Sequence, residues 1–309
     1  RQFGVRSAIP MSRAVHLCPA LVIVRPNFQQ YRAVSNQVFD IFRRVTPLVE
    51  PMSLDEAYLD VTENAWGEAL GMAVARRIKD EIRATTGLTA SAGVAPNKFL
   101  AKIASGWQKP DGLTVIAPER VERFLQRLPV DALWGVGPVT ASKLRAHGIE
   151  KLVQIRTVEP RILREAVGSL AEWLTPLAHG IDDRPVIPER EPKSSGSENT
   201  YEQDLSGMDE IRSEIEAMAR SAATWLDRKQ LYARTVTIKV RYHDFTTITR
   251  SQSAAATRDH ENIVLRALAL LAKTDAGRRP VRLLGVSVHN LVEDADAEAP
   301  APQPALPFS

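Results

Sequence analysis

The chain has 309 residues and a mass of 34.1 kDa, and at roughly 100–200 residues per domain we expect two or three domains. Hydrophobic residues make up 44% of the sequence and charged residues 25%, which excludes a chain that is disordered as a whole, a collagen-like fibre and a disulfide scaffold. The net charge is only +3, but residues 228–282 hold twelve Lys and Arg against four acids, an excess typical of a surface that binds a polyanion, with a solvated face as the open alternative.

Alternating helix and strand signals run through residues 1–116 and predict a mixed α/β layer. In the expected helices apolar residues recur every three or four positions, while Asn97 is placed to cap one helix and Gly87 to end another. The predicted elements are, in chain order, a buried strand 21–24, a helix 28–45, a hairpin 48–62, a helix 67–86, a strand 88–94, a helix 98–106, a turn 109–112 and a strand 113–116.

The rest of the chain predicts a helical region followed by a second α/β unit. Residues 117–186 favour short helices, and residues 187–197, rich in Pro, Ser and charges, favour a linker. Residues 198–292 give the order β-α-β-β-α-β, which is the ferredoxin-like pattern, and we expect the Ala- and Pro-rich tail 293–309 to be disordered. The expected fold class is therefore α/β (α+β) and multidomain.

Compartment signals are few. The single cysteine, Cys18, has no partner for an intrachain disulfide, which favours a reducing compartment and predicts a cytoplasmic protein. No apolar run approaches the ~20 residues that cross a bilayer, so we expect no membrane partner. Because the first residue is Arg1 and no signal-peptide pattern follows it, we interpret the sequence as a fragment or a processed form.

Two adjacent carboxylates, Asp55 and Glu56, stand among apolar residues inside the predicted hairpin. Strand alternation would turn one of them inward, and an unpaired buried carboxylate is costly. A hard divalent cation such as Mg²⁺ resolves this conflict because it prefers carboxylate oxygens as ligands. The pair therefore indicates a metal site, with a hairpin tip that carries two solvated acids as the alternative.

Three lysines, Lys98, Lys102 and Lys109, follow the predicted strand 88–94 within about three helical turns. Ammonium groups in this position can bind phosphate by charge. Taken alone, the Lys-x-x-x-Lys spacing is explained better by a helix with a solvated basic face.

Three segments in register resemble motifs of the Y-family, translesion DNA polymerases. Residues 53–60 (SLDEAYLD) are similar to their acidic signature, residues 97–112 to their second palm motif, and residues 3–11 to their finger segment. The resemblance extends to about Val292 and implies a right-hand polymerase. Its parts would be partial fingers 1–26, a palm 27–116, a helical thumb 117–186, a linker 187–197, a little finger 198–292 and a tail 293–309.

The resemblance implies DNA-templated addition of deoxynucleotides to a primer 3′-OH with two Mg²⁺ ions. Asp55 would bridge the two ions and Glu56 would hold the catalytic one. Lys109 would contact the triphosphate of the incoming nucleotide. Arg1 matches the arginine of the family's Tyr-x-x-Arg finger motif and would reach the β- and γ-phosphates.

The finger segment also implies low fidelity. Ser7 and Ala8 match the small residues that pack over the nascent base pair, where they leave room for distorted bases. The family's third carboxylate, its steric gate against ribonucleotides and its finger tyrosine would all lie upstream of Arg1, and neither Asp40 nor Glu50 matches that carboxylate. We therefore expect a truncated piece that does not polymerise DNA unaided. The open alternatives are a non-catalytic DNA-binding and clamp-docking module, and a two-metal nuclease or other phosphotransferase.

Two further regions are predicted to hold primer-template DNA. Gly135 and Gly137 lie between two predicted helices, where a helix-hairpin-helix brings backbone N–H groups to DNA phosphate; a plain turn is the alternative. In the last domain a polar sheet face would contact the DNA backbone, with a merely hydrated face as the alternative. The residues expected on that face are Lys239, Arg241, Thr247 and Thr249.

The final residues form a short peptide motif, Gln-x-x-Leu-x-Phe, made by Gln303, Leu306 and Phe308. It resembles the peptide by which bacterial polymerases bind the sliding clamp. Leu306 and Phe308 would fill an apolar pocket of the clamp while Gln303 supplies hydrogen bonds. We therefore expect the clamp as a partner.

Overall fold

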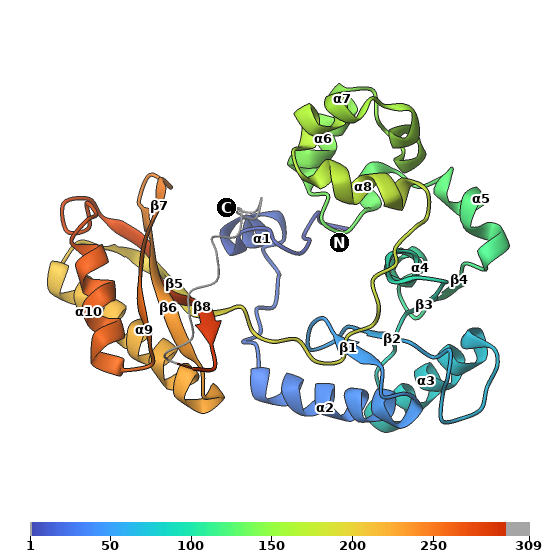
Figure 1. The fold of residues 1–309 in the computed structure, drawn as a ribbon, viewed down its shortest axis with the longest axis horizontal. Coiled ribbons are helices and arrows are strands. Elements are labelled where there is room, and N and C mark those ends of the chain that lie inside the picture. The colour runs from blue at the N-terminus through green and yellow to red at the C-terminus, as the bar shows by residue number, and fades with distance from the viewer. Residues whose placement is uncertain (1, 295–309) are drawn as a thin grey trace. The chain divides into compact units, whose positions relative to one another are not determined.

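The computed structural model describes residues 2–294 of the chain. These residues divide into two compact units, one that ends at Glu189 and one that begins at Arg190 (Figure 1). Among the described residues, no helix is both long and apolar enough to cross a membrane.

The first unit starts with a short helix, α1 (Met11–Leu17), and an irregular segment. The prediction of a buried strand over residues 21–24 is wrong: this segment forms no strand, and Val22 and Val24 are 82% and 79% exposed. An isolated apolar run gains strand structure only through a neighbour that bonds its N–H and C=O groups. In the described part of this unit, the strands pair only with one another, β1 with β2 and β3 with β4.

Helices and short strands alternate from residue 28 to residue 115, as the sequence predicts. Strands β1 and β2 form an antiparallel hairpin, and β3 and β4 are parallel and are joined through α4. The side chains of Phe39, Val45, Val49 and Val74 are buried in this part. The elements are α2 (Phe28–Val45), β1 (Val49–Pro51), β2 (Ala57–Leu59), α3 (Gly71–Thr86), β3 (Ala92–Val94), α4 (Lys98–Trp107) and β4 (Leu113–Val115).

The region after β4 is helical, as predicted, and shares a hydrophobic core with α4. Phe99 and Leu100 of α4 pack in one cluster with Leu125, Leu144 and Leu174 from the later helices. Helix α4 therefore connects strands β3 and β4 and also packs in the core of the later helices. The elements are η1 (Pro118–Arg120), α5 (Val121–Leu125), η2 (Val130–Ala132), α6 (Pro138–Ala146), η3 (Leu152–Thr157), α7 (Pro160–Val167) and α8 (Leu170–Ala178), where η marks a 3-10 helix.

The second unit has the predicted β-α-β-β-α-β order. Its antiparallel sheet has the strand order β5-β8-β6-β7, so the last strand of the chain lies between the first two. The chain order alone does not predict this spatial order. The elements are β5 (Ser194–Leu205), α9 (Met208–Lys229), β6 (Tyr232–Tyr242), β7 (Thr247–Thr257), α10 (His260–Leu271) and β8 (Val281–Val292).

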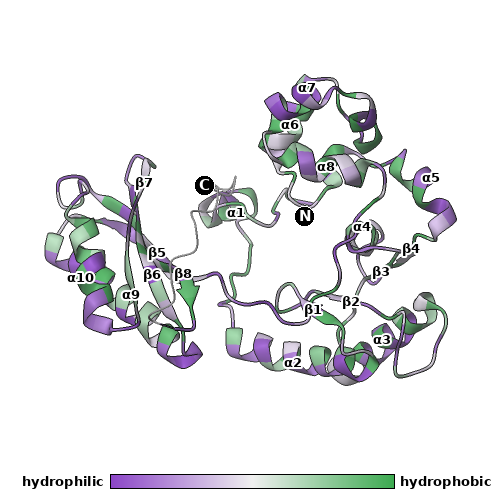
Figure 2. Cartoon of the chain, viewed as in Figure 1, coloured by the Kyte–Doolittle hydropathy of each residue, from purple (hydrophilic) through white to green (hydrophobic). Residues whose placement is uncertain are grey.

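Helices α9 and α10 supply the core on one side of this sheet. Val236, Ile238 and Val240 of β6 are fully buried against them, whereas the intervening residues point to the open face. Figure 2 shows hydrophobic and hydrophilic residues alternating along both helices, as expected for helices with one face on a sheet. Strand β5 begins at Ser194, so residues 194–197, which the sequence assigned to the linker, belong to the sheet. Their backbone pairs with β8, and this pairing outweighs their linker-like composition.

Candidate active site

The two acids of the signature lie together in the tight connection between β1 and β2. The backbone N–H of Met52 donates to the carbonyl of Glu56 at 2.9 Å and closes this turn. Asp55 is exposed, and one of its oxygens accepts a hydrogen bond from the Ser53 hydroxyl at 2.6 Å. The turn thus presents the Asp55 carboxylate to solvent and leaves the adjacent Glu56 half-buried.

The lysines of the second motif have three different environments, and the expectation of a solvated basic helix face is wrong for two of them. Lys102 reaches back to the hairpin, with its Nζ 2.7 Å from Glu56 Oε2. Lys98 is buried. Lys109 lies beyond α4 and is exposed, without a hydrogen bond or ion pair in the described part of the chain. The adjacent Asp111 is fixed by Lys79, whose Nζ lies 2.7 Å from its carboxylate.

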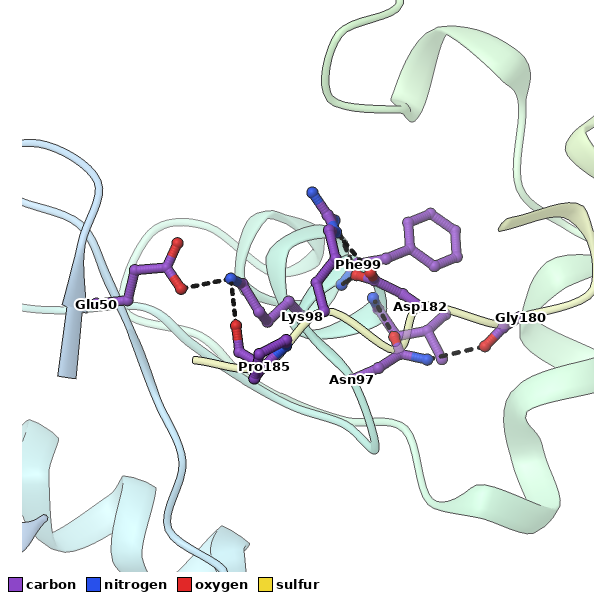
Figure 3. A network of polar contacts seen from close by, with 9 residues as sticks. Glu50, Asn97, Lys98, Phe99, Gly180, Asp182 and Pro185 are labelled. Atoms are coloured by element: carbon purple, nitrogen blue, oxygen red, sulfur yellow. Dashed lines mark hydrogen bonds and ion pairs between the residues drawn. The ribbon is translucent and has the colours of Figure 1, made fainter. Parts of the chain in front are cut away.

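A buried ion pair between Glu50 and Lys98 stands next to this site (Figure 3). The two side chains are 3% and 7% exposed. Lys98 also donates to the carbonyl of Pro185 at 2.9 Å, and Glu50 accepts from the backbone N–H of Ile187 at 2.9 Å. Sequence reasoning missed this pair. The available signal was a glutamate directly after the buried Val49, but its partner lies 48 positions away.

Further hydrogen bonds hold the segment 180–187 against the N-terminal end of α4 (Figure 3). Asn97 caps α4, as predicted, by accepting from the backbone N–H of Leu100, and its amide donates to the carbonyl of Gly180 at 2.8 Å. The carboxylate of Asp182 accepts from the backbone N–H of Phe99 at 2.9 Å. This segment leads directly to the second unit, so the chain leaves the first unit from a fixed point beside the hairpin.

Burial and charge set the protonation of two groups near the hairpin. Burial on its own would raise the pKa of Asp182, but the hydrogen bonds and charge of Arg184, together with the N–H of Phe99, hold it below its usual value. Burial raises the pKa of Tyr58, which keeps this phenol protonated at neutral pH. The Lys98 ammonium lies 5.1 Å from the centre of the Tyr58 ring.

The hairpin offers carboxylate oxygens, the type of ligand that Mg²⁺ prefers. Mg²⁺ is usually held by one or two carboxylates, with water and substrate phosphates completing its six positions. Asp55 and Glu56 supply two such carboxylates on adjacent residues. Within residues 2–294, no group of three or more His, Cys, Asp or Glu is arranged to hold a metal ion. The two hairpin carboxylates are therefore the donors available to such an ion at this turn.

The predicted finger residues lie in a turn at the start of the chain. Ser7 and Ala8 are exposed, and Ala8 has a φ of +64°, which is uncommon for a residue other than glycine. Arg1 lies outside the described residues, as do the clamp-motif residues Gln303, Leu306 and Phe308.

The predicted DNA-binding glycines lie immediately before α6. Gly135 has a φ of +88°, a conformation that favours glycine, and Gly137 is the N-cap of the helix. A Cβ on Gly137 would meet no atom within 4 Å, so the space above it is open. Trp134, next to the turn, is 60% exposed.

The predicted DNA-binding residues of the second unit share the open face of its sheet. Lys239 forms an ion pair of 2.8 Å with Glu198, and Arg241 Nε donates to the Thr247 hydroxyl at 2.7 Å. Thr249 lies opposite Lys239 in the register. The two cations are therefore on the predicted face, but each already has a polar partner there.

Comparison with known proteins identifies the family. The impB/mucB/samB family pattern matches residues 1–106, its helix-hairpin-helix motif matches residues 118–149, and its C-terminal domain matches residues 192–301. A DNA polymerase IV of Alkalilimnicola ehrlichii is 48% identical over 94% of this chain and 82% of its own length. A DNA polymerase IV of Akkermansia muciniphila is 44% identical over 95% and 82%.

Solved structures agree with this assignment. A chimera of the Y-family DNA polymerases Dbh and Dpo4 superimposes with a TM-score of 0.83 at 29% identity, over 95% of this chain and 86% of that chain. A DinB-family error-prone DNA polymerase from Sulfolobus solfataricus gives a TM-score of 0.61 at 29% identity, over 95% and 88%. The chain belongs to the Y-family of DNA polymerases. The resemblance to this family is thereby confirmed, as is the expected multidomain fold class.

Proposed function

We propose that this Y-family chain acts in translesion DNA synthesis, as a DNA-dependent polymerase that adds nucleotides to a primer 3′ end with low fidelity. The observation that carries the proposal is the pair Asp55 and Glu56, presented by a closed turn between β1 and β2 in a chain of this family. The relatives' name, DNA polymerase IV, and the solved ternary complex of Dbh DNA polymerase support primer-template DNA and nucleotide as ligands.

In the proposed reaction, Asp55 and Glu56 would hold two Mg²⁺ ions. Bound Mg²⁺ lowers the pKa of a primer hydroxyl and neutralises the charge of a triphosphate. The Lys102 ammonium, 2.7 Å from Glu56, positions this carboxylate, and it would have to share the carboxylate with a bound metal. The exposed Lys109, with Arg1, would bind the triphosphate. Ser7 and Ala8 would leave space beside the nascent base pair.

DNA would be held without reading its sequence. The backbone around Gly135 and Gly137 is open to a phosphate, and the sheet face with Lys239, Arg241, Thr247 and Thr249 offers charge and hydroxyl groups. Contacts of this kind position a duplex but carry no sequence information. They suit an enzyme that must accept any template.

Templated nucleotide binding tests the proposal. The chain is mixed with a primer-template whose primer ends in a dideoxynucleotide, in the presence of Mg²⁺. Its affinity for this DNA is measured by fluorescence anisotropy with and without the complementary deoxynucleotide. We expect the complementary nucleotide to increase the affinity for DNA. Asp55→Asn or Glu56→Gln should make this increase about tenfold smaller, which corresponds to about 1.4 kcal/mol. Asp40→Asn, an exposed acid on α2, is the matched control and should leave the gain intact.

The alternative is a non-catalytic module that binds DNA and docks on the clamp, and equal effects of all four deoxynucleotides in this assay would favour it. Primer extension with Mg²⁺ measures nucleotide addition directly. A cytoplasmic location remains a prediction from the single Cys18.

Docking on a bacterial sliding clamp through Gln303, Leu306 and Phe308 is proposed from the sequence motif. Deletion of residues 303–309 should abolish pull-down of the chain by immobilised clamp, because the two apolar side chains of the motif are the expected anchors. Binding to clamp-free DNA should not change. Retention of the deleted chain on the clamp would contradict the motif's role.

A further inference from the structure

The turn between β6 and β7 of the second unit presents an aromatic ring to solvent. Phe245 is 65% exposed and has a φ of +66°, a strained conformation for a bulky side chain. The strain is maintained by backbone bonds: Phe245 N–H donates to the Tyr242 carbonyl at 2.9 Å, and Tyr242 N–H donates to the Thr246 carbonyl at 2.9 Å. Thr246 N–H also donates to the Asp244 carboxylate at 3.1 Å. These bonds fix the backbone of the turn that carries the exposed ring.

One arginine lies beside this ring, and a second pairs with the residue before it in the turn. The guanidinium of Arg282 lies 5.0 Å from the centre of the Phe245 ring. Arg279 pairs with Asp244 at 2.7 Å, and the side chain of Arg278, in the same loop, is 84% exposed. Arg278 and Arg282 form only long ion pairs, 4.0 Å to Asp275 and 3.8 Å to Asp204, and neither guanidinium makes a hydrogen bond within the described residues. Both guanidinium groups therefore keep donors for an anionic ligand.

We propose that Phe245 is a stacking platform for an unpaired base of single-stranded template DNA, with Arg278 and Arg282 binding the neighbouring phosphates. The inference rests on the proposed function and names a contact for that substrate. A ring that is exposed on a hydrogen-bonded turn and lies beside an arginine combines the two features that single-strand binding requires, base stacking and a charged path for the backbone. An unpaired base has a free face, whereas a base inside a duplex must first be unstacked. These arginines favour a nucleic acid over an uncharged protein partner.

Three DNA probes test this site with the full chain. They share one fluorescein-labelled duplex and carry a ten-nucleotide template overhang, the same overhang built of abasic sugars, or no overhang. Phe245→Asn removes the ring but keeps a residue that tolerates a positive φ. We expect it to weaken binding of the overhang probe by about fivefold, the low end of one stacked base, and to leave the other two probes unchanged.

Two further variants distinguish the effect of base stacking from the effect of charge and from the effect of removing any exposed apolar side chain. Leu265→Ala, on α10, removes another apolar side chain that is 65% exposed and should change no probe. Arg278→Gln should weaken binding of both overhang probes, because abasic sugars keep their phosphates. Equal affinities of wild type and Phe245→Asn for the overhang probe, or an equal loss on the blunt duplex, would overturn the proposal. If none of the three probes binds the wild type, it is the proposed function that fails.

Discussion

At the scale of single residues, Asp182 illustrates how one buried carboxylate fixes a segment. Its side chain is 3% exposed, yet Arg184 and the N–H of Phe99 keep its pKa below the usual value. A carboxyl group whose pKa is lower in the folded than in the unfolded state stabilises the fold above its unfolded pKa, about 3.9. This stabilisation is lost as the pH falls through the folded pKa.

Asp182→Asn is therefore expected to destabilise the first unit by about 1.5–3 kcal/mol at pH 7, the range for hydrogen bonds to a charged group. The difference from wild type should begin to shrink as the pH falls below about 4, because the unfolded wild-type chain then protonates this carboxyl group while the folded chain still holds it ionised. This difference in unfolding free energy is measured by urea unfolding at several pH values, with tryptophan fluorescence as the signal. The exposed neighbour Asp183 provides the control, since Asp183→Asn should have little effect at any pH. A constant difference between wild type and Asp182→Asn from pH 7 to pH 3 would contradict the assignment.

At the scale of elements, the sequence predicted correctly those features that depend on neighbouring residues, namely helices and their ends. The apolar periodicity of α2 and the caps at Asn97 and Gly87 are confirmed because helix ends are decided by nearby residues. The strand expected over residues 21–24 is wrong because a strand depends on a distant partner. The Glu50–Lys98 pair was missed for the same reason. The sequence indicated that Asp55 and Glu56 belong together, but not that Lys102 contacts Glu56.

The end of α3 provides a test of this local control. Gly87 has a φ of +70° and its N–H donates to the Arg83 carbonyl at 2.9 Å, while a Cβ there would meet no atom within 4 Å. Gly87→Ala should therefore cost about 1 kcal/mol through backbone strain alone. Gly106→Ala, inside α4 and equally open, should instead stabilise by about 0.5–1 kcal/mol. Urea midpoints of both variants measure the effects, and changes of the same sign would refute the argument.

At the scale of the whole molecule, the charge excess of residues 228–282 is placed on defined surfaces of the second unit. The open face of its sheet carries Lys239 and Arg241, whereas α9 and α10 cover the opposite face. Sequence counting found the excess but not the partners that reduce it. Lys239 in particular is paired with Glu198, so its contribution to DNA binding depends on whether a phosphate replaces this carboxylate.

The salt dependence of DNA binding measures this exchange. Replacing Lys239 and Arg241 together by Gln should weaken binding of a primer-template about equally for unrelated sequences and reduce the slope of log K against log salt by up to about 1.8, because two phosphate contacts are lost. Glu198→Gln should strengthen binding at low salt, since it frees the Lys239 ammonium. Arg220→Gln, whose partner Glu261 lies at the start of α10, removes a charge from the helical side and serves as the control. A loss confined to one DNA sequence, or an unchanged slope, would show that this face does not bind the DNA backbone.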